Sequence, residues 1–136
     1  MSLTEKLMMA DAKKASEPEE RTFKSRQLAK LIGAKDPVEV KIREVSPERL
    51  TDFMAMMIDQ NGNVNVGRSF DGNAMVCTDA IVDPDVKDPD LAKHFGCTTP
   101  VELVKKLFKF EVSEIAGIVM EMAGLGSDAE DEVKNL

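Results

Sequence analysis

The chain has 136 residues, 43% of them hydrophobic and 32% charged, and its formal net charge is −7. This balance is typical of one globular domain with a single core, and it excludes a chain that is disordered throughout.

The negative charge argues against nucleic acid as a partner, because phosphate backbones repel an acidic surface unless basic residues cluster. We also expect no membrane partner, since no apolar stretch is long enough for a transmembrane helix. The N-terminus lacks the apolar core of a signal peptide, so the protein is expected to stay in the cytoplasm where it is made.

Residues 1–21 are expected to form a short helix and a linker that are partly flexible. Ser2 and Glu5 have the spacing of a capping box, which predicts a helix over residues 2–10. The apolar residues that would share one stripe of this helix are Leu3, Leu7 and Met8. A helix of one or two turns is unstable alone in water, so it must dock on something or fray.

The next segment predicts a small antiparallel β-hairpin. Residues 38–45 alternate between apolar and charged side chains, with Val38, Val40 and Ile42 on one face. We pair this strand with a short strand over residues 22–24, and we place a brief helix at 26–32 between them, capped by Ser25 and stopped by Gly33. Because two strands alone are marginally stable, helices must cover the apolar face.

The remainder of the chain predicts short helices with clear start signals. Ser46-Pro47, Asp88-Pro89 and Thr99-Pro100 each place a capping side chain directly before a proline at the first helical position. The first of these helices is followed by a polar loop over residues 59–69, and a further helix is predicted from Asp71, as the cap, through Gly72 to Val82. The inward-facing residues predicted for these helices and for a last one over 111–123 are Leu50, Phe53, Met54, Met57, Ile58, Ala74, Cys77, Thr78, Ile81, Leu103, Val104, Leu107, Phe108, Val112, Ile115, Ala116, Val119 and Met122.

The predicted fold class is therefore α+β and mainly α, with several short helices packed on a small antiparallel β-hairpin near the N-terminal half. The globular domain is expected over residues 22–126, and an acidic mobile tail over 127–136.

The sequence provides little support for catalysis, a cofactor or a metal. His94 has no second histidine or cysteine near it, and Cys77 and Cys97 belong to no metal-ligand or redox motif, so two buried thiols are expected. Residues 59–70 fail the EF-hand pattern, which requires glycine at the sixth position and glutamate at the twelfth. The four aspartates of residues 83–90 are each explained as turn or cap residues beside proline. The lysines nearest to a basic cluster, Lys105, Lys106 and Lys109, have the spacing of the solvated side of a helix.

Some apolar side chains are left over once the predicted core is filled. Met56 and Met120 lie off the predicted stripes, and the stripe of the N-terminal helix needs a partner. Methionine adapts to varied partners and recurs on surfaces that bind helices or flexible peptides. Isolated exposed apolar residues are also common in proteins that bind nothing there. The candidate partner-binding residues are Leu3, Leu7, Met8, Met56 and Met120.

The order of several segments resembles the XkdN-like phage tail assembly chaperones. These segments are Asp71–Ala74, Ala80–Leu91, Phe95-Gly96, Thr99–Leu107, Glu111-Val112, Ile115, Met122–Gly124 and Val133–Asn135. The N-terminal helix and Ser25-Arg26 look similar as well. The chain departs from the family pattern at Phe110-Glu111, where Gly-Glu is usual.

The resemblance implies a protein without catalytic activity that acts in the cytoplasm of an infected or lysogenic bacterium. Such chaperones bind the tape measure protein, and possibly tail tube subunits, until the tube polymerises around the tape. An acidic protein with short helices could cover a long apolar helical client while keeping the complex soluble. Two other classes remain open: an acidic regulatory or adaptor protein that binds a basic surface, whose binding would fade steeply with salt, and a small metal-dependent enzyme that uses Asp83–Asp90.

Overall fold

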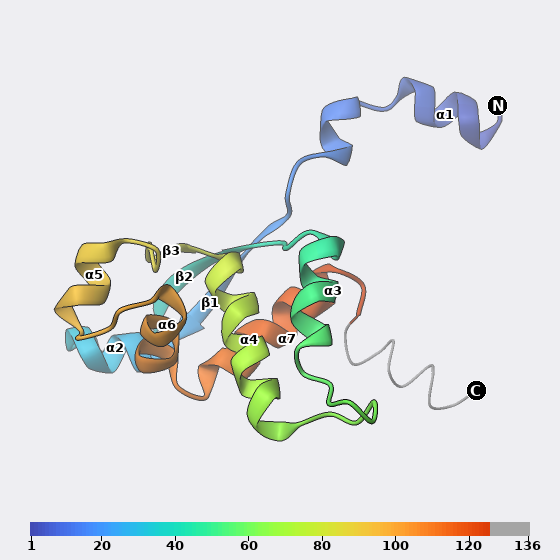
Figure 1. Cartoon of the computed structure of the whole chain (residues 1–136). Helices are drawn as coiled ribbons and strands as arrows, with labels where there is room; N and C mark the ends of the chain where they lie inside the picture. The colour runs from blue at the N-terminus through green and yellow to red at the C-terminus, as the bar shows by residue number, and fades with distance from the viewer. Residues whose placement is uncertain (126–136) are drawn as a thin grey trace.

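The computed structural model describes residues 1–125, in which helices predominate over a small sheet (Figure 1). The helices are α1 (Leu3–Met9), the 3-10 helix η1 (Ala12–Ala15), α2 (Arg26–Ile32), α3 (Pro47–Ala55), α4 (Val66–Ala80), α5 (Pro89–His94), α6 (Pro100–Phe108) and α7 (Glu111–Met122). The strands are β1 (Glu20–Ser25), β2 (Val38–Arg43) and β3 (Ile81–Asp83). The predicted class, α+β and mainly α, is confirmed. The acidic tail predicted over residues 127–136 lies outside the described residues.

The sheet has three antiparallel strands in the order β1-β2-β3. The predicted hairpin is present, with Phe23 opposite Val40, and the apolar face of β2 is buried as its alternation predicted. The third strand corrects the prediction that the preceding helix continues to Val82, because Ile81 instead pairs with Ile42. Two successive β-branched residues ahead of Asp83-Pro84 suit a strand, and the open edge of β2 supplies the hydrogen-bonding partner.

Helix α4 begins six residues earlier than expected and lies at the centre of the helical layer. Its cap is Asn65, whose side-chain oxygen accepts a hydrogen bond from the Arg68 N–H, so Asp71 lies within the helix and does not cap it. Residues 66–69 include a glycine and two residues of low helix propensity, so the sequence alone does not predict a helix start at Asn65. Packing against α3, α6 and α7 compensates for that weak propensity.

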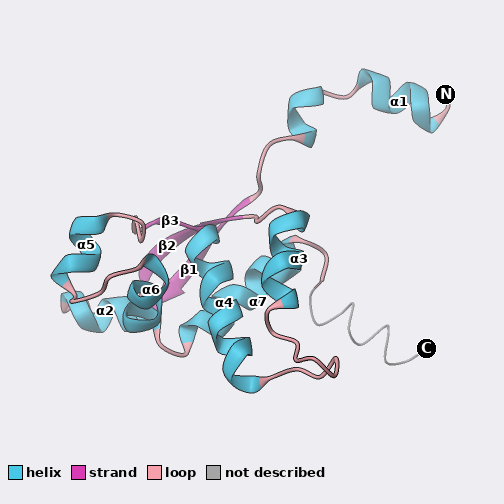
Figure 2. Cartoon of the chain, viewed as in Figure 1, coloured by secondary structure: helices cyan, strands magenta, loops and turns pink. Residues whose placement is uncertain are grey.

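The core forms between the sheet and the helices α4, α6 and α7. Figure 2 shows the strands as a small layer behind these helices. The largest side chains that are fully buried in it are Phe108, Ile42, Leu50, Leu103, Ile115, Val40, Val76, Val86, Val104, Val112 and Val119. The core is aliphatic apart from Phe23, Phe108 and the two cysteines, which agrees with a sequence that has no Trp or Tyr.

The three predicted Pro-containing helix starts are confirmed. The side chains of Ser46, Asp88 and Thr99 each accept a hydrogen bond from a backbone N–H of the first helical turn, and a proline follows each of them. Gly33 and Gly124 follow the ends of α2 and α7 with φ of 72° and 80°, a conformation that disfavours residues with a side chain.

The N-terminal segment stands apart from this core. Ser2 caps α1 as predicted, by accepting a hydrogen bond from the Glu5 N–H. All residues from 1 to 19 are exposed, and α1 projects from the start of β1 away from the body of the protein (Figure 1).

Candidate functional site

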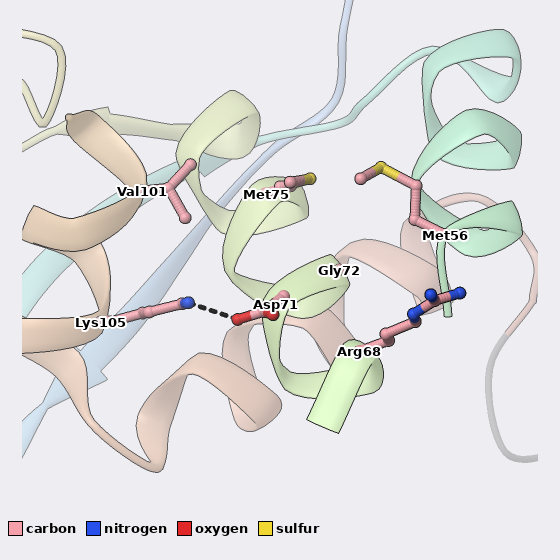
Figure 3. Close-up of a pocket in the computed structure, with 7 residues that line it drawn as sticks. All are labelled: Met56, Arg68, Asp71, Gly72, Met75, Val101 and Lys105. Atoms are coloured by element: carbon pink, nitrogen blue, oxygen red, sulfur yellow. Dashed lines mark hydrogen bonds and ion pairs between the residues drawn. The ribbon is translucent and has the colours of Figure 1, made fainter. Parts of the chain in front are cut away.

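A groove of about 570 Å³ opens between α3, α4 and α6 (Figure 3). We call it the central groove, and its lining residues are Met56, Arg68, Asp71, Gly72, Met75, Val101 and Lys105. The Met56 and Met75 side chains point toward one another across it, from the end of α3 and the middle of α4 (Figure 3). Met56 is 48% exposed although the side chain is large and apolar, so the groove presents apolar surface to solvent.

An ion pair borders the central groove on the α6 side. The Lys105 ammonium group donates to the Asp71 carboxylate, and it also lies 5.9 Å from the centre of the Phe70 ring. Such a partly exposed pair contributes little to stability, but it holds both charges at the edge and leaves the methionines at the centre. Arg68 adds a cation at the opposite end (Figure 3).

Gly72 sets the distance between α3 and α4 at this groove. A Cβ atom at this position would lie 2.6 Å from Met57 Cγ and 3.3 Å from the Phe53 carbonyl oxygen. A side chain at residue 72 would therefore push the two helices apart, and with them the two walls that carry Met56 and Met75.

A second groove, of about 310 Å³, lies between α2, β2, α5 and α6. We call it the lateral groove, and its lining residues are Leu28, Leu31, Ile32, Val38, Glu39, Asp83, Pro84, Leu91, Phe95 and Leu107. Its surface is mainly aliphatic, and Leu31 and Ile32 on α2 are 54% and 69% exposed. Glu39 and Asp83 are its two acidic residues.

The structure separates the five residues that the sequence singled out. Leu3, Leu7 and Met8 are 72%, 65% and 82% exposed on α1, and Met56 lies in the central groove. Met120 is half-buried on α7 and packs against the core.

Three groove residues, Met75, Leu31 and Ile32, are not among those that the sequence pattern singled out. Met75 lies within the predicted helix but beside its stripe of Ala74 and Cys77, so the periodicity assigned it no role. Leu28, Leu31 and Ile32 have the spacing of one helical face, so the pattern that reveals the lateral groove was present but was not followed.

The groups tested for chemistry have structural roles. The Asp85 and Asp88 side chains accept hydrogen bonds from the N–H groups of Lys87 and Asp90, which confirms that they act as turn and cap residues. Among residues 1–125, no group of three or more His, Cys, Asp or Glu residues is arranged to hold a metal ion. Asp59 likewise accepts from the backbone N–H groups of Asn61 and Asn63 and closes its own loop.

Both cysteines are buried and free, as predicted. Burial raises the pKa of the Cys77 thiol to about 12, and its Sγ lies 3.2 Å from the Val112 carbonyl oxygen, to which the thiol donates. A thiol that stays protonated at neutral pH is a poor nucleophile. Within residues 1–125, no helix is both long and apolar enough to cross a membrane.

A buried carboxylate ties α7 to α2. Glu111 accepts hydrogen bonds from the Ser25 hydroxyl at 2.6 Å and from the Arg26 N–H at 2.9 Å, so it caps α2 from a distant part of the chain. The Ser25 hydroxyl oxygen in turn accepts from the Leu28 N–H. The turn before Glu111 places its positive φ, 52°, at Lys109, and Phe110 is in the ordinary helical region.

Comparison with known proteins identifies the family. Residues 4–136 match the family model described as phage XkdN-like tail assembly chaperone protein. The chain belongs to this family. No significant match was found among curated proteins or among solved structures. The suspected resemblance is thereby confirmed, and it extends over nearly the whole chain, including both grooves and all of α1 except Leu3.

Proposed function

We propose that this tail assembly chaperone binds the tape measure protein, and possibly tail tube subunits, and keeps the tape soluble until the tube polymerises. Family membership supports the general role in tail assembly. The observation that carries the choice of client is the methionine-lined central groove, because a long apolar helical protein needs a partner that covers a helix face.

The chemistry of the central groove suits a helix whose sequence varies along its length. Met56 and Met75 have flexible, polarisable side chains that adapt to different apolar surfaces. Asp71, Lys105 and Arg68 at its border can pair with polar residues that flank an apolar stripe. The net charge of −7 would keep the complex in solution.

The exposed stripe of α1 is a second proposed contact with the client. Leu3, Leu7 and Met8 can fold over one side of a bound helix while the body holds the other side. Met120 is a lesser candidate, because the core already covers part of its side chain. The proposed role requires no catalysis and no cofactor, and we place it in the host bacterial cytoplasm, where tail proteins are made.

Co-expression with the tape measure protein of the same gene cluster tests this proposal. We expect the wild-type chain to keep most of the tape soluble and to co-purify with it. Met56→Lys and Met75→Lys should each reduce the soluble tape several-fold, because a charge in the groove opposes burial against an apolar helix. Val64→Lys is the matched control, since Val64 is 69% exposed in the nearby α3–α4 loop and lines neither groove.

The result that would overturn the proposal is a tape that stays insoluble, with no complex formed with tube protein either. The salt dependence of binding distinguishes the adaptor alternative. An apolar groove contact should persist in 0.5 M NaCl, whereas binding to a basic surface should weaken steeply between low and moderate salt.

A further inference from the structure

Arg68 lies at a point in α4 where the helix itself gives its charge no favourable partner. It is the third residue of α4, and the first turn of that helix holds no acidic residue. Backbone N–H groups give the beginning of a helix a partial positive charge, so a cation there is unfavourable. The Asn65 cap accepts a hydrogen bond from the Arg68 backbone N–H, which any residue except proline would supply. Helix stability therefore does not account for the arginine side chain.

The carboxylate that would neutralise Arg68 is engaged elsewhere. Asp71 follows three residues later, a spacing at which opposite charges pair along a helix. The fold instead pairs Asp71 with Lys105 of α6, and in Figure 3 the Arg68 guanidinium group points away from them, toward the end of α3. Asp59, the single acidic residue of the α3–α4 loop, accepts hydrogen bonds from backbone N–H groups of its own turn. Among residues 1–125, Arg68 takes part in no ion pair.

The charges along the central groove are therefore unequal at its two ends. The Asp71–Lys105 pair is neutral, and Arg68 leaves one positive charge at the opposite end. A helix lying on the methionines along α4 would turn one flank of its apolar stripe to α6 and the other to α3. A carboxylate beside Arg68 gains charge-assisted, often bidentate hydrogen bonds, whereas a lysine there meets a like charge. The groove thus distinguishes between clients that apolar contact alone would treat alike.

We propose that Arg68 selects client helices that carry Glu or Asp on one flank of the apolar stripe, and that it fixes the direction in which such a helix lies. This inference rests on the proposed function, because it takes the client to be an apolar helix in the central groove. Turning a helix end for end in a groove exchanges its two flanks, so a client with one acidic flank meets Arg68 in only one direction. Selection acts on the charge of the flank and leaves the apolar residues free to vary, as the methionines allow.

Two designed peptides of about 20 residues test the selection directly. Both carry the same leucine stripe; one has Glu on both flanks and Lys on the far face, and the other has these positions exchanged. The two peptides thus have the same composition and no net charge. By fluorescence anisotropy in low salt, we expect the full wild-type chain to bind the Glu-flanked peptide about five-fold more tightly than the Lys-flanked one. Arg68→Gln should abolish this preference, Arg68→Glu should reverse it, and about 0.5 M NaCl should reduce it.

Lys30→Glu is the matched control for the charge reversal. It changes the net charge by the same amount as Arg68→Glu, at an exposed position of α2 that lines neither groove, and it should keep the wild-type preference. Thermal unfolding adds a second readout. Arg68→Gln should be as stable as the wild type, because it removes a cation from the first turn of α4 and breaks no ion pair. A clear loss of stability would assign Arg68 a structural role and count against the proposal.

Equal affinity of the wild type for the two peptides would overturn the proposal, as would a preference that survives Arg68→Glu or one that Lys30→Glu also reverses. Each of these results would leave the central groove standing as the client site. Failure of the wild type to bind either peptide would overturn the proposal as well. The co-expression of chaperone and tape would then decide separately whether the tape is the client.

Discussion

Helices α1 and α6 have similar local sequences and opposite environments. Each is a short amphipathic helix with a hydroxyl side chain at its cap, Ser2 in α1 and Thr99 in α6. The apolar face of α6 is buried against α4, α7 and α2, whereas no residue of α1 is buried. The same local signals thus produce a core element in one place and an exposed arm in the other.

The difference shows that capping and periodicity determine where a helix begins and which face is apolar. They do not determine what that face packs against. In α6 the partners come from segments that are distant in sequence, and their packing supplies most of the stability of the helix. In α1 no residue is buried, so packing adds nothing comparable to the stability of this helix.

The sharpest test of the comparison is one substitution made in both helices. Leu103→Ala in α6 should lower the free energy of unfolding by about 2–5 kcal/mol, because it leaves a cavity in the core. Leu7→Ala in α1 should change it by less than about 0.5 kcal/mol in dilute solution. Urea denaturation measures both, and similar losses would mean that α1 packs on the body of its own chain.

Removal of the buried carboxylate of Glu111 should have the next largest effect. Glu111→Ala leaves the Ser25 hydroxyl and the Arg26 N–H without their acceptor, with an expected loss of about 1–3 kcal/mol. Glu111→Gln keeps an acceptor oxygen and should lose less. Glu114→Ala, at an exposed position of the same turn, is the control for helix propensity and first-turn charge. A loss as large as that of Glu111→Ala in this control would show that the α2 cap contributes little.

Two glycines should respond in opposite directions to the same change. Gly72→Ala should destabilise the protein by about 1–3 kcal/mol, because the new Cβ overlaps Met57 and crowds the Phe53 carbonyl. Gly117→Ala meets open space in α7 and should stabilise the protein by about 0.5–1 kcal/mol. Thermal unfolding distinguishes the two, and a neutral Gly72→Ala would mean that α3 can move away from α4 at little cost.

The smallest expected effect concerns acid stability at the start of α6. The Thr98 backbone N–H, and then its hydroxyl, donate to the Glu102 carboxylate and hold its pKa below the ordinary value of 4.5. This contribution is present above that value and is lost as the pH falls through the lowered pKa of the folded state. Glu102→Gln should therefore be slightly less stable than the wild type at pH 7, and the difference should shrink as the pH falls below 4.5 and through the lowered pKa of Glu102. A stability difference between the two proteins that does not change with pH would show that the charge of Glu102 does not contribute to that difference.

The sequence determined the features that depend on a few neighbouring residues. Caps at Ser2, Ser46, Asp88 and Thr99 act over two or three residues, and the alternation along β2 depends on that strand alone. The order of such segments was also sufficient to suggest the family, and Met56 was identified as apolar surface beyond the core.

Tertiary structure decided what depends on pairing across the chain. The strand Ile81–Asp83 forms because β2 has an open edge. The Glu111 carboxylate can be buried because the hydroxyl of Ser25, 86 residues earlier in the chain, donates a hydrogen bond to it. Both grooves arise where helices from separate segments meet, so the position of Met75 opposite Met56, and the groove that Leu31 and Ile32 line, exist only in the folded chain. Local capping energies act within one turn, whereas burial depends on which distant segments pack together.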